Sequence, residues 1–203
     1  MPLAQLRRVK GDDMNIELNG ARLDLIPLYE HKISYCLWRD WLTDPKVNRY
    51  MMSGLERPSR LDLIEYGEEG ICLGIFLHPI YKSKNDGWIG NIRLHQINKE
   101  QRTAELGIMI GDKERWGQGY ATEACTLLLS HAFGKMNLHR VGIGVVCKNQ
   151  GGLALWTKLG FREEGRLREA FWVDGKACDV IRMGLLQREW FNEDSRRSSS
   201  AIG

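Results

Sequence analysis

Short segments with the apolar pattern of β-strands recur along the chain. Residues 21–27 alternate polar and apolar side chains, as a half-buried strand does. Residues 71–77 are an unbroken apolar run, which predicts a central strand. The sequences Asn-Asp-Gly at 85–87 and Asp-Gly at 174–175 are typical of tight hairpin turns. Strands are therefore expected at residues 21–27, 71–77, 88–97, 102–111, 138–147, 161–168, 169–173 and 177–186.

Helical periodicity fills the segments between these strands. Residues 30–42, 119–136 and 150–159 place apolar side chains three and four positions apart. Shorter helices are expected after Asp44, with Pro45 at the first position, and after residue 58. The order of elements predicts an α/β domain of the mixed type, with no internal repeat.

One domain is expected, over residues 14–191. Residues 1–13 are interpreted as a flexible extension, and the polar, Ser-rich residues 192–203 as a disordered tail. A length of 203 residues suits one such domain, and 43% hydrophobic and 27% charged residues are ordinary for a globular protein.

The composition also limits which binding partners and which cellular compartment are expected. A net charge of +3 is too small to indicate nucleic acid, and no apolar run reaches the length of about 18 residues that a membrane span needs. Five cysteines without C-x-x-C spacing, and no signal peptide, predict reduced thiols and a cytoplasmic protein. The five histidines do not have the spacing of metal ligands, so no metal site is expected.

The strand–loop–helix segment at residues 107–122 carries the strongest sign of a ligand site. Gly117 and Gly119 stand where the helix begins, and Thr122 adds a hydroxyl. Glycines let successive backbone N–H groups point at one spot, and the positive end of the helix dipole suits a phosphate. The Gly-Lys-Ser/Thr of nucleotide P-loops and the third glycine of dinucleotide loops are missing. On this evidence alone, an ordinary glycine-bearing helix start remains open.

Two motifs at the right separation resemble the GNAT N-acetyltransferases. The loop at residues 116–121, Trp-Gly-Gln-Gly-Tyr-Ala, is similar to the Gln/Arg-x-x-Gly-x-Gly/Ala of the family's acyl-CoA loop. Residues 149–161, Asn-Gln-Gly-Gly-Leu-Ala-Leu-Trp-Thr-Lys-Leu-Gly-Phe, resemble its Asn-x-x-Ala-x-x-x-Tyr-x-Lys-x-Gly-Phe. Together the motifs resemble the branch that contains ribosomal-protein alanine acetyltransferases and spermidine acetyltransferases.

The resemblance implies a mixed, splayed central sheet flanked by helices, with pantetheine lying where two parallel strands part. It implies acetyl-CoA as co-substrate and a primary amine as acceptor. The residues expected to bind the cofactor are Met109, Ile110, Trp116, Gly117, Gln118, Gly119, Tyr120, Ala121, Thr122, Asn149 and Trp156.

Two residues depart from the family pattern. Trp116 replaces Gln or Arg, a mild change because backbone amides do most of the phosphate holding. Trp156 replaces the tyrosine that often protonates the leaving thiolate, and an indole cannot supply that proton. We therefore expect Trp156 to pack against pantetheine.

Glu105 is the candidate general base. It lies on the strand before the glycine loop, where some family members carry a catalytic glutamate, and a period of two places it on one face with Gly107 and Met109. A salt-bridged strand glutamate is an equally open interpretation. Backbone N–H groups near Met109 and Ile110 are expected to polarise the thioester carbonyl.

Three further assignments stay open at the level of sequence. Asn149 either binds pantetheine or caps a helix. Trp38 and Trp41 either line the acceptor pocket or, more often for such a pattern, pack in the core. The acceptor is a protein N-terminus or a small amine, and homodimer formation is undecided. A CoA-binding regulator without catalysis is the alternative function.

Overall fold

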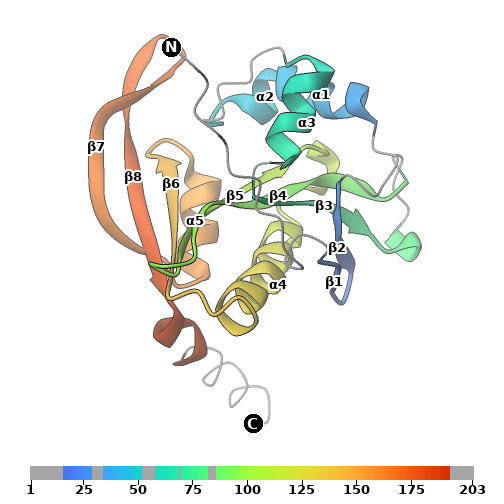
Figure 1. The fold of residues 1–203 in the computed structure, drawn as a ribbon. Helices are drawn as coiled ribbons and strands as arrows, with labels where there is room; N and C mark the ends of the chain where they lie inside the picture. Colours follow the sequence, from blue (N-terminus) through green and yellow to red (C-terminus); the bar gives the residue numbers. More distant parts are fainter. Residues whose placement is uncertain (1–15, 29–33, 52–57, 69, 82–85, 193–203) are drawn as a thin grey trace, which may run out of the picture.

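The computed structural model describes residues 16–28, 34–51, 58–68, 70–81 and 86–192, which form one eight-stranded sheet with helices on both faces (Figure 1). The strands are β1 (Leu18–Asn19), β2 (Leu23–Pro27), β3 (Ile71–Leu77), β4 (Trp88–Asn98), β5 (Thr103–Ile110), β6 (Arg140–Val146), β7 (Arg162–Val173) and β8 (Lys176–Leu186). The helices are α1 (Tyr35–Thr43), α2 (Pro45–Asn48), α3 (Arg60–Glu68), α4 (Tyr120–Gly134) and α5 (Gln150–Lys158), with short 3₁₀ turns η2 (Pro79–Tyr81) and η3 (Lys113–Arg115).

Strand order explains where the sheet opens. The order is β1-β2-β3-β4-β5-β6-β8-β7, and among the described strands only β5 and β6 pair in parallel. Their pairing joins Thr103–Glu105 to Arg140–Gly142 and stops there, although both strands continue. The two strands therefore diverge beyond Glu105, which confirms the expected mixed and splayed sheet.

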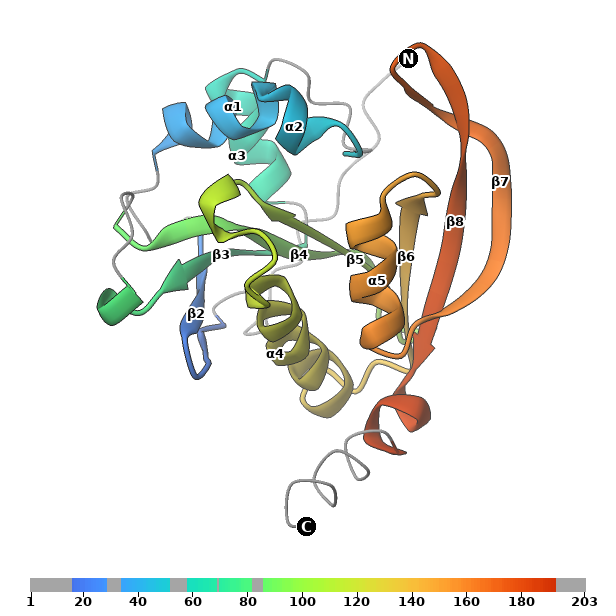
Figure 2. The same ribbon diagram turned by 180° about the vertical axis from the view of Figure 1, so that it is seen from behind.

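The alternation of side chains divides the core between the two faces of the sheet. Ala104 and Leu106 of β5 face the larger apolar cluster, which also contains buried residues of α4 and α5. Met109 faces a second cluster under α1 and α3, together with Trp38 and Trp41. Figure 2 shows the same arrangement from behind, with α1 to α3 across the sheet from α4.

Local chemistry sets where the helices begin. Asp44 caps α2 by accepting a hydrogen bond from the Lys46 amide, with Pro45 at the first position as expected. Asn149 caps α5 in the same way. Helix α4 differs, because its cap is Gly119 in a left-handed conformation (φ 82°), which provides no capping side chain.

One expectation for the last strands is wrong. Residues 161–168 and 169–173 were expected as two strands, but Arg162–Val173 is the single strand β7. Its pairing with β8 shifts register twice, and Glu169 has a positive φ of 52°, so local irregularities absorb the break that the sequence suggested.

The structure describes only part of the two ends of the chain. A helical turn at residues 187–192, not expected from the sequence, follows β8 and includes Asn192 of the expected tail. The expected extension at 1–13 and the remainder of that tail lie outside the described residues. None of the helices described is both long and apolar enough to cross a membrane.

Candidate functional site

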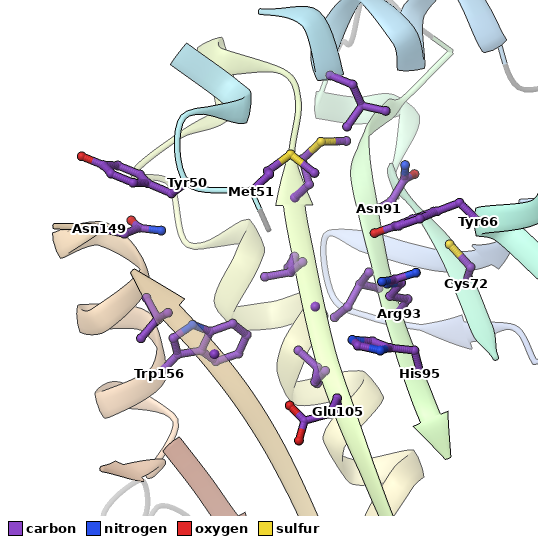
Figure 3. Close-up of a pocket in the computed structure, with 18 of the residues that line it drawn as sticks. Tyr50, Met51, Tyr66, Cys72, Asn91, Arg93, His95, Glu105, Asn149 and Trp156 are labelled. Atoms are coloured by element: carbon purple, nitrogen blue, oxygen red, sulfur yellow. The ribbon is translucent and has the colours of Figure 1, made fainter. Parts of the chain in front are cut away.

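A cavity of about 230 Å³ lies where β5 and β6 part. Its walls come from both halves of the sheet, from α1 and α3 on one side and from α5 on the other (Figure 3). Gly107 of β5 and Gly144 of β6 line it, so little side-chain volume fills the opening between the strands. The space is therefore a consequence of the divergence of the two parallel strands.

Glu105 lies at the base of this opening, at the last position of β5 that pairs with β6. Its carboxylate lies over Gly142 of β6, where a Cβ would come within 2.4 Å of Oε1. Arg182 of β8 donates a hydrogen bond from Nη2 to the same oxygen at 2.7 Å. The structure thus realises the salt-bridged arrangement and also places Glu105 on the cavity wall, with 20% of its side chain exposed.

A stripe of polar residues on β4 runs beside Glu105. His95 pairs with Glu105, Arg93 with Gly107 and Asn91 with Met109, and all of them line the cavity (Figure 3). There is no register shift between these pairs, so Glu105, Gly107 and Met109 share a face as predicted. The β4 residues were not expected, although their alternation within the strand predicted at 88–97 was visible in the sequence.

The face of the sheet under α1 and α3 carries aromatic side chains and one thiol, that of Cys72 on β3. Trp38 is only 2% exposed and packs in the core, yet it also lines the cavity; Trp41 packs on Trp88 with ring centroids 4.8 Å apart. Core packing is thus the main role of both. Burial raises the pKa of the Cys72 thiol to about 12, against a smaller opposing effect of the Arg93 cation. This thiol is therefore protonated at neutral pH, which makes it a poor nucleophile.

Helix α5 forms the opposite wall. Trp156 is 6% exposed and packs edge-on against Phe161, with ring centroids 5.3 Å apart, while its surface also lines the cavity. The side-chain oxygen of Asn149 accepts a hydrogen bond from the Gly152 amide at 2.9 Å. Asn149 is therefore a helix cap that lies on the cavity wall, so the cap does not exclude a ligand contact.

The glycine loop presents backbone amides at the start of α4. Gly117 and Gly119 both have positive φ, 72° and 82°, and no side chain caps the helix. Trp116 donates its indole N–H to the Ile110 carbonyl at 2.8 Å, and the side-chain nitrogen Nε2 of Gln118 donates to the Glu114 carbonyl at 2.6 Å. These bonds fix the loop without using the first amides of α4, which is the arrangement that binds phosphate.

The other residues that were expected to bind the cofactor differ in how exposed their side chains are. Tyr120 is buried at 4% exposed, whereas Ala121 and Thr122 are half-buried on the first turn of α4. Met109 and Ile110 end β5 beyond the point where β6 leaves it. Because N–H groups alternate in direction along a strand, every second amide there faces the opening.

Arg22, which no sequence motif indicated, donates hydrogen bonds to the glycine loop and to the first turn of α4. Its backbone N–H and its Nε donate to the Glu123 carboxylate at 2.8 and 2.7 Å, and Nη1 donates to the Gln118 carbonyl at 3.0 Å. Its guanidinium also lies 4.5 Å from the centre of the Tyr120 ring. Only the tertiary fold brings Arg22, which directly precedes β2, to this loop, so no local sequence signal marked this residue.

No group of three or more His, Cys, Asp or Glu side chains is placed to hold a metal among the residues described. All five cysteines are free thiols.

Comparison with known proteins identifies the fold. The profile of the acetyltransferase (GNAT) domain matches residues 22–162. A provisionally named ribosomal N-acetyltransferase of Bacillus subtilis is 38% identical over 104 residues, 51% of this chain and 56% of that protein. Spermidine N(1)-acetyltransferase of Vibrio cholerae is 36% identical over 104 residues, 51% of this chain and 60% of that protein. The matched segment thus spans less than two thirds of either relative.

A solved structure extends the likeness to the whole fold. The spermidine N-acetyltransferase of Vibrio cholerae in complex with CoA and spermine superposes with a TM-score of 0.72 at 26% identity, covering 84% of this chain and 98% of that one. The β5–β6 opening and the uncapped helix thus occur within a fold that binds CoA in this neighbour.

Proposed function

This chain belongs to the GNAT acetyltransferase family, and from that premise we propose that it transfers the acetyl group of acetyl-CoA to a primary amine. One observation carries the proposal: β5, the strand that borders the opening, leads through η3 to the uncapped start of α4. Backbone amides of the loop hold the pyrophosphate, and pantetheine lies along the free edge of β5. Asn149 and Trp156 flank the pantetheine from α5, and the thioester points towards Glu105.

Glu105 acts as the general base in this proposal. An alkyl amine with a pKa of ~10.4 is protonated at neutral pH, and deprotonating it costs roughly 4–5 kcal/mol; for an α-amine near ~8 the cost is about 1–1.5 kcal/mol. Arg182 engages Oε1 of Glu105, and no described residue hydrogen-bonds to Oε2, which leaves that oxygen to take the proton.

Transfer then proceeds by direct attack. The neutral amine attacks the thioester carbon while amides of β5 near Met109 and Ile110 stabilise the developing oxyanion. The C–S bond breaks, the CoA thiolate leaves, and the attacking nitrogen loses its second proton to water. Its thiol has an intrinsic pKa near that of a free cysteine, ~8.5, so it is a tolerable leaving group that water can protonate. Trp156 packs against the thioester end and transfers no proton.

The names of the relatives suggest the acceptors to try first, because one is a ribosomal and one a spermidine acetyltransferase. The test is a panel of amines, including peptide N-termini and polyamines, with release of free CoA as the readout. We expect amine-dependent release in at least one case. Absence of release from every amine, despite bound acetyl-CoA, would instead favour the non-catalytic CoA-binding alternative.

The cofactor assignment has its own test. Acetyl-CoA at 100 times its dissociation constant should stabilise the wild-type protein by about 2.7 kcal/mol. Gly119→Asp places a side chain in a left-handed position and a carboxylate among the phosphate-binding amides, so this gain should disappear. An unchanged ligand-induced shift in melting temperature for the variant contradicts the assignment.

A further inference from the structure

The segment that is proposed to hold the pyrophosphate has more acidic than basic side chains. Between residues 112 and 123 the charged side chains are Asp112, Glu114, Glu123, Lys113 and Arg115. Both cations are engaged by carboxylates, because Lys113 bonds to the aspartate that caps α2 and Arg115 pairs with Asp112. An excess of negative charge opposes the binding of an anionic pyrophosphate. A cation from another part of the chain would offset this excess.

Glu123 is the acidic residue that belongs to the phosphate-binding helix itself. It lies in the first turn of α4, which begins after Gly119, and its side chain is 17% exposed. The positive end of a helix attracts a carboxylate and a phosphate alike. An uncompensated Glu123 would therefore compete with the phosphates of the cofactor for the same end of α4.

Arg22 binds both carboxylate oxygens of Glu123. Its backbone N–H donates to Oε1 at 2.8 Å and its Nε donates to Oε2 at 2.7 Å. Gly20 allows this close approach, because a Cβ at that position would lie 3.0 Å from Oε1. Within the described part of the chain, Arg22 supplies all of the hydrogen bonds to this carboxylate, so Glu123 takes none of the first amides of α4.

The same guanidinium also lies against the glycine loop. Its Nη1 donates to the Gln118 carbonyl at 3.0 Å, and its carbon lies 4.5 Å from the centre of the Tyr120 ring. Its Nη2 lies beside Gly119, where a Cβ would come within 3.4 Å of it. The donors of a guanidinium have a fixed planar geometry, so these contacts hold the positive charge at the start of α4.

We propose that Arg22 sets the affinity for the phosphates of acetyl-CoA by neutralising Glu123 and holding its carboxylate away from the first amides of α4. Arg22 acts through Glu123 and the loop, so it is a positioning residue. The proposal rests on the acetyltransferase function proposed above, in which the start of α4 holds the pyrophosphate, and it extends the cofactor site to a residue outside both sequence motifs.

Titration of acetyl-CoA in low-salt buffer free of phosphate tests this proposal with three variants. Arg22→Met leaves the charge of Glu123 uncompensated and should weaken binding roughly tenfold. Glu123→Gln removes the negative charge and should bind at least as tightly as the wild type. The double variant restores the charge balance, so it should bind more tightly than Arg22→Met, whereas a purely structural role predicts no recovery when a second partner of the contact is lost.

Salt and a second arginine provide the controls. At ~1 M sodium chloride the difference between the wild type and Arg22→Met should shrink, because both side chains are partly exposed and their charges are screened. Arg166→Met removes an arginine that pairs with Glu163 at 2.8 Å on exposed β7, and it should bind acetyl-CoA as the wild type does. Thermal unfolding without ligand checks that each variant is folded.

Three results would overturn the proposal: wild-type affinity in Arg22→Met, a double variant that binds no more tightly than Arg22→Met, or weaker binding by Glu123→Gln. The last result applies even if Arg22→Met does not fold. Loss of amine-dependent CoA release, with the affinities as expected, would contradict only the proposed acetyl transfer.

Discussion

The residue on which the chemistry depends most is Glu105. In Glu105→Gln the proton acceptor is lost while size is kept, so kcat/KM should fall by roughly 10²–10⁴-fold with acetyl-CoA affinity nearly unchanged. The loss should shrink as pH rises, because more of the amine is then already deprotonated. Glu163→Gln is the matched control, since Glu163 pairs with Arg166 on exposed β7. Activity of Glu105→Gln within threefold of wild type at pH 7 would rule out the role as base.

Substitutions of Trp156 distinguish a packing role of this residue from a role as general acid. The residue is buried against Phe161, so Trp156→Phe should preserve most contacts and leave kcat within about tenfold. Trp156→Ala should raise the KM for acetyl-CoA through lost burial. Trp156→Tyr restores the residue of the family motif: a rise in kcat of more than tenfold at unchanged KM would mean that a missing acid limits the wild-type enzyme.

Single residues were predictable from the sequence to the extent that their role is local. The glycines of the loop and the Asn149 cap, one of the two roles left open for that residue, follow from short-range rules, and the structure has both at the start of a helix. Arg182 and Arg22 instead reach their partners across 77 and 101 positions of the chain. No periodicity encodes such contacts, so both were missed.

At the scale of the element, Gly142 of β6 determines where the carboxylate of Glu105 can lie. Gly142→Ala would place a Cβ 2.4 Å from the present position of Glu105 Oε1, and the carboxylate must move away. A displacement of this size should lower kcat/KM on the order of 10–10²-fold, with acetyl-CoA binding kept. Gly165→Ala is the control in another strand, because a Cβ there meets nothing within 4 Å. Equal activity of the two variants would show that the Glu105 position is unimportant.

Most elements were predictable because their apolar periodicity and end signals agree. The expected strand at 71–77 is β3, and the expected helix at 119–136 contains α4. Strand β7 was divided wrongly, because its burial pattern is almost wholly exposed and therefore offers no alternation to read. The two-residue strand β1 is too short to give any pattern.

At the scale of the whole molecule, the opening is bounded by contacts between distant segments. At its base, β5 and β6 pair at Thr103–Glu105. Across the opening, Arg49 beside α2 forms an ion pair with Asp174 at the β7–β8 turn, and Tyr50 packs against apolar residues of that hairpin while lining the cavity. The sequence predicted the turn but not what it contacts, since the contact depends on how far the hairpin reaches beyond β6.

The measurement that tests the account most directly is an initial-rate analysis with acetyl-CoA and an accepted amine varied together. Direct attack requires both substrates in the opening at once, so double-reciprocal plots should intersect, and CoA release should depend on the amine. The protonated Cys72 thiol supports this expectation, because burial holds its pKa at about 12. Parallel lines, together with an acetylated enzyme detected by mass spectrometry in the absence of amine, would indicate a covalent intermediate and contradict the account.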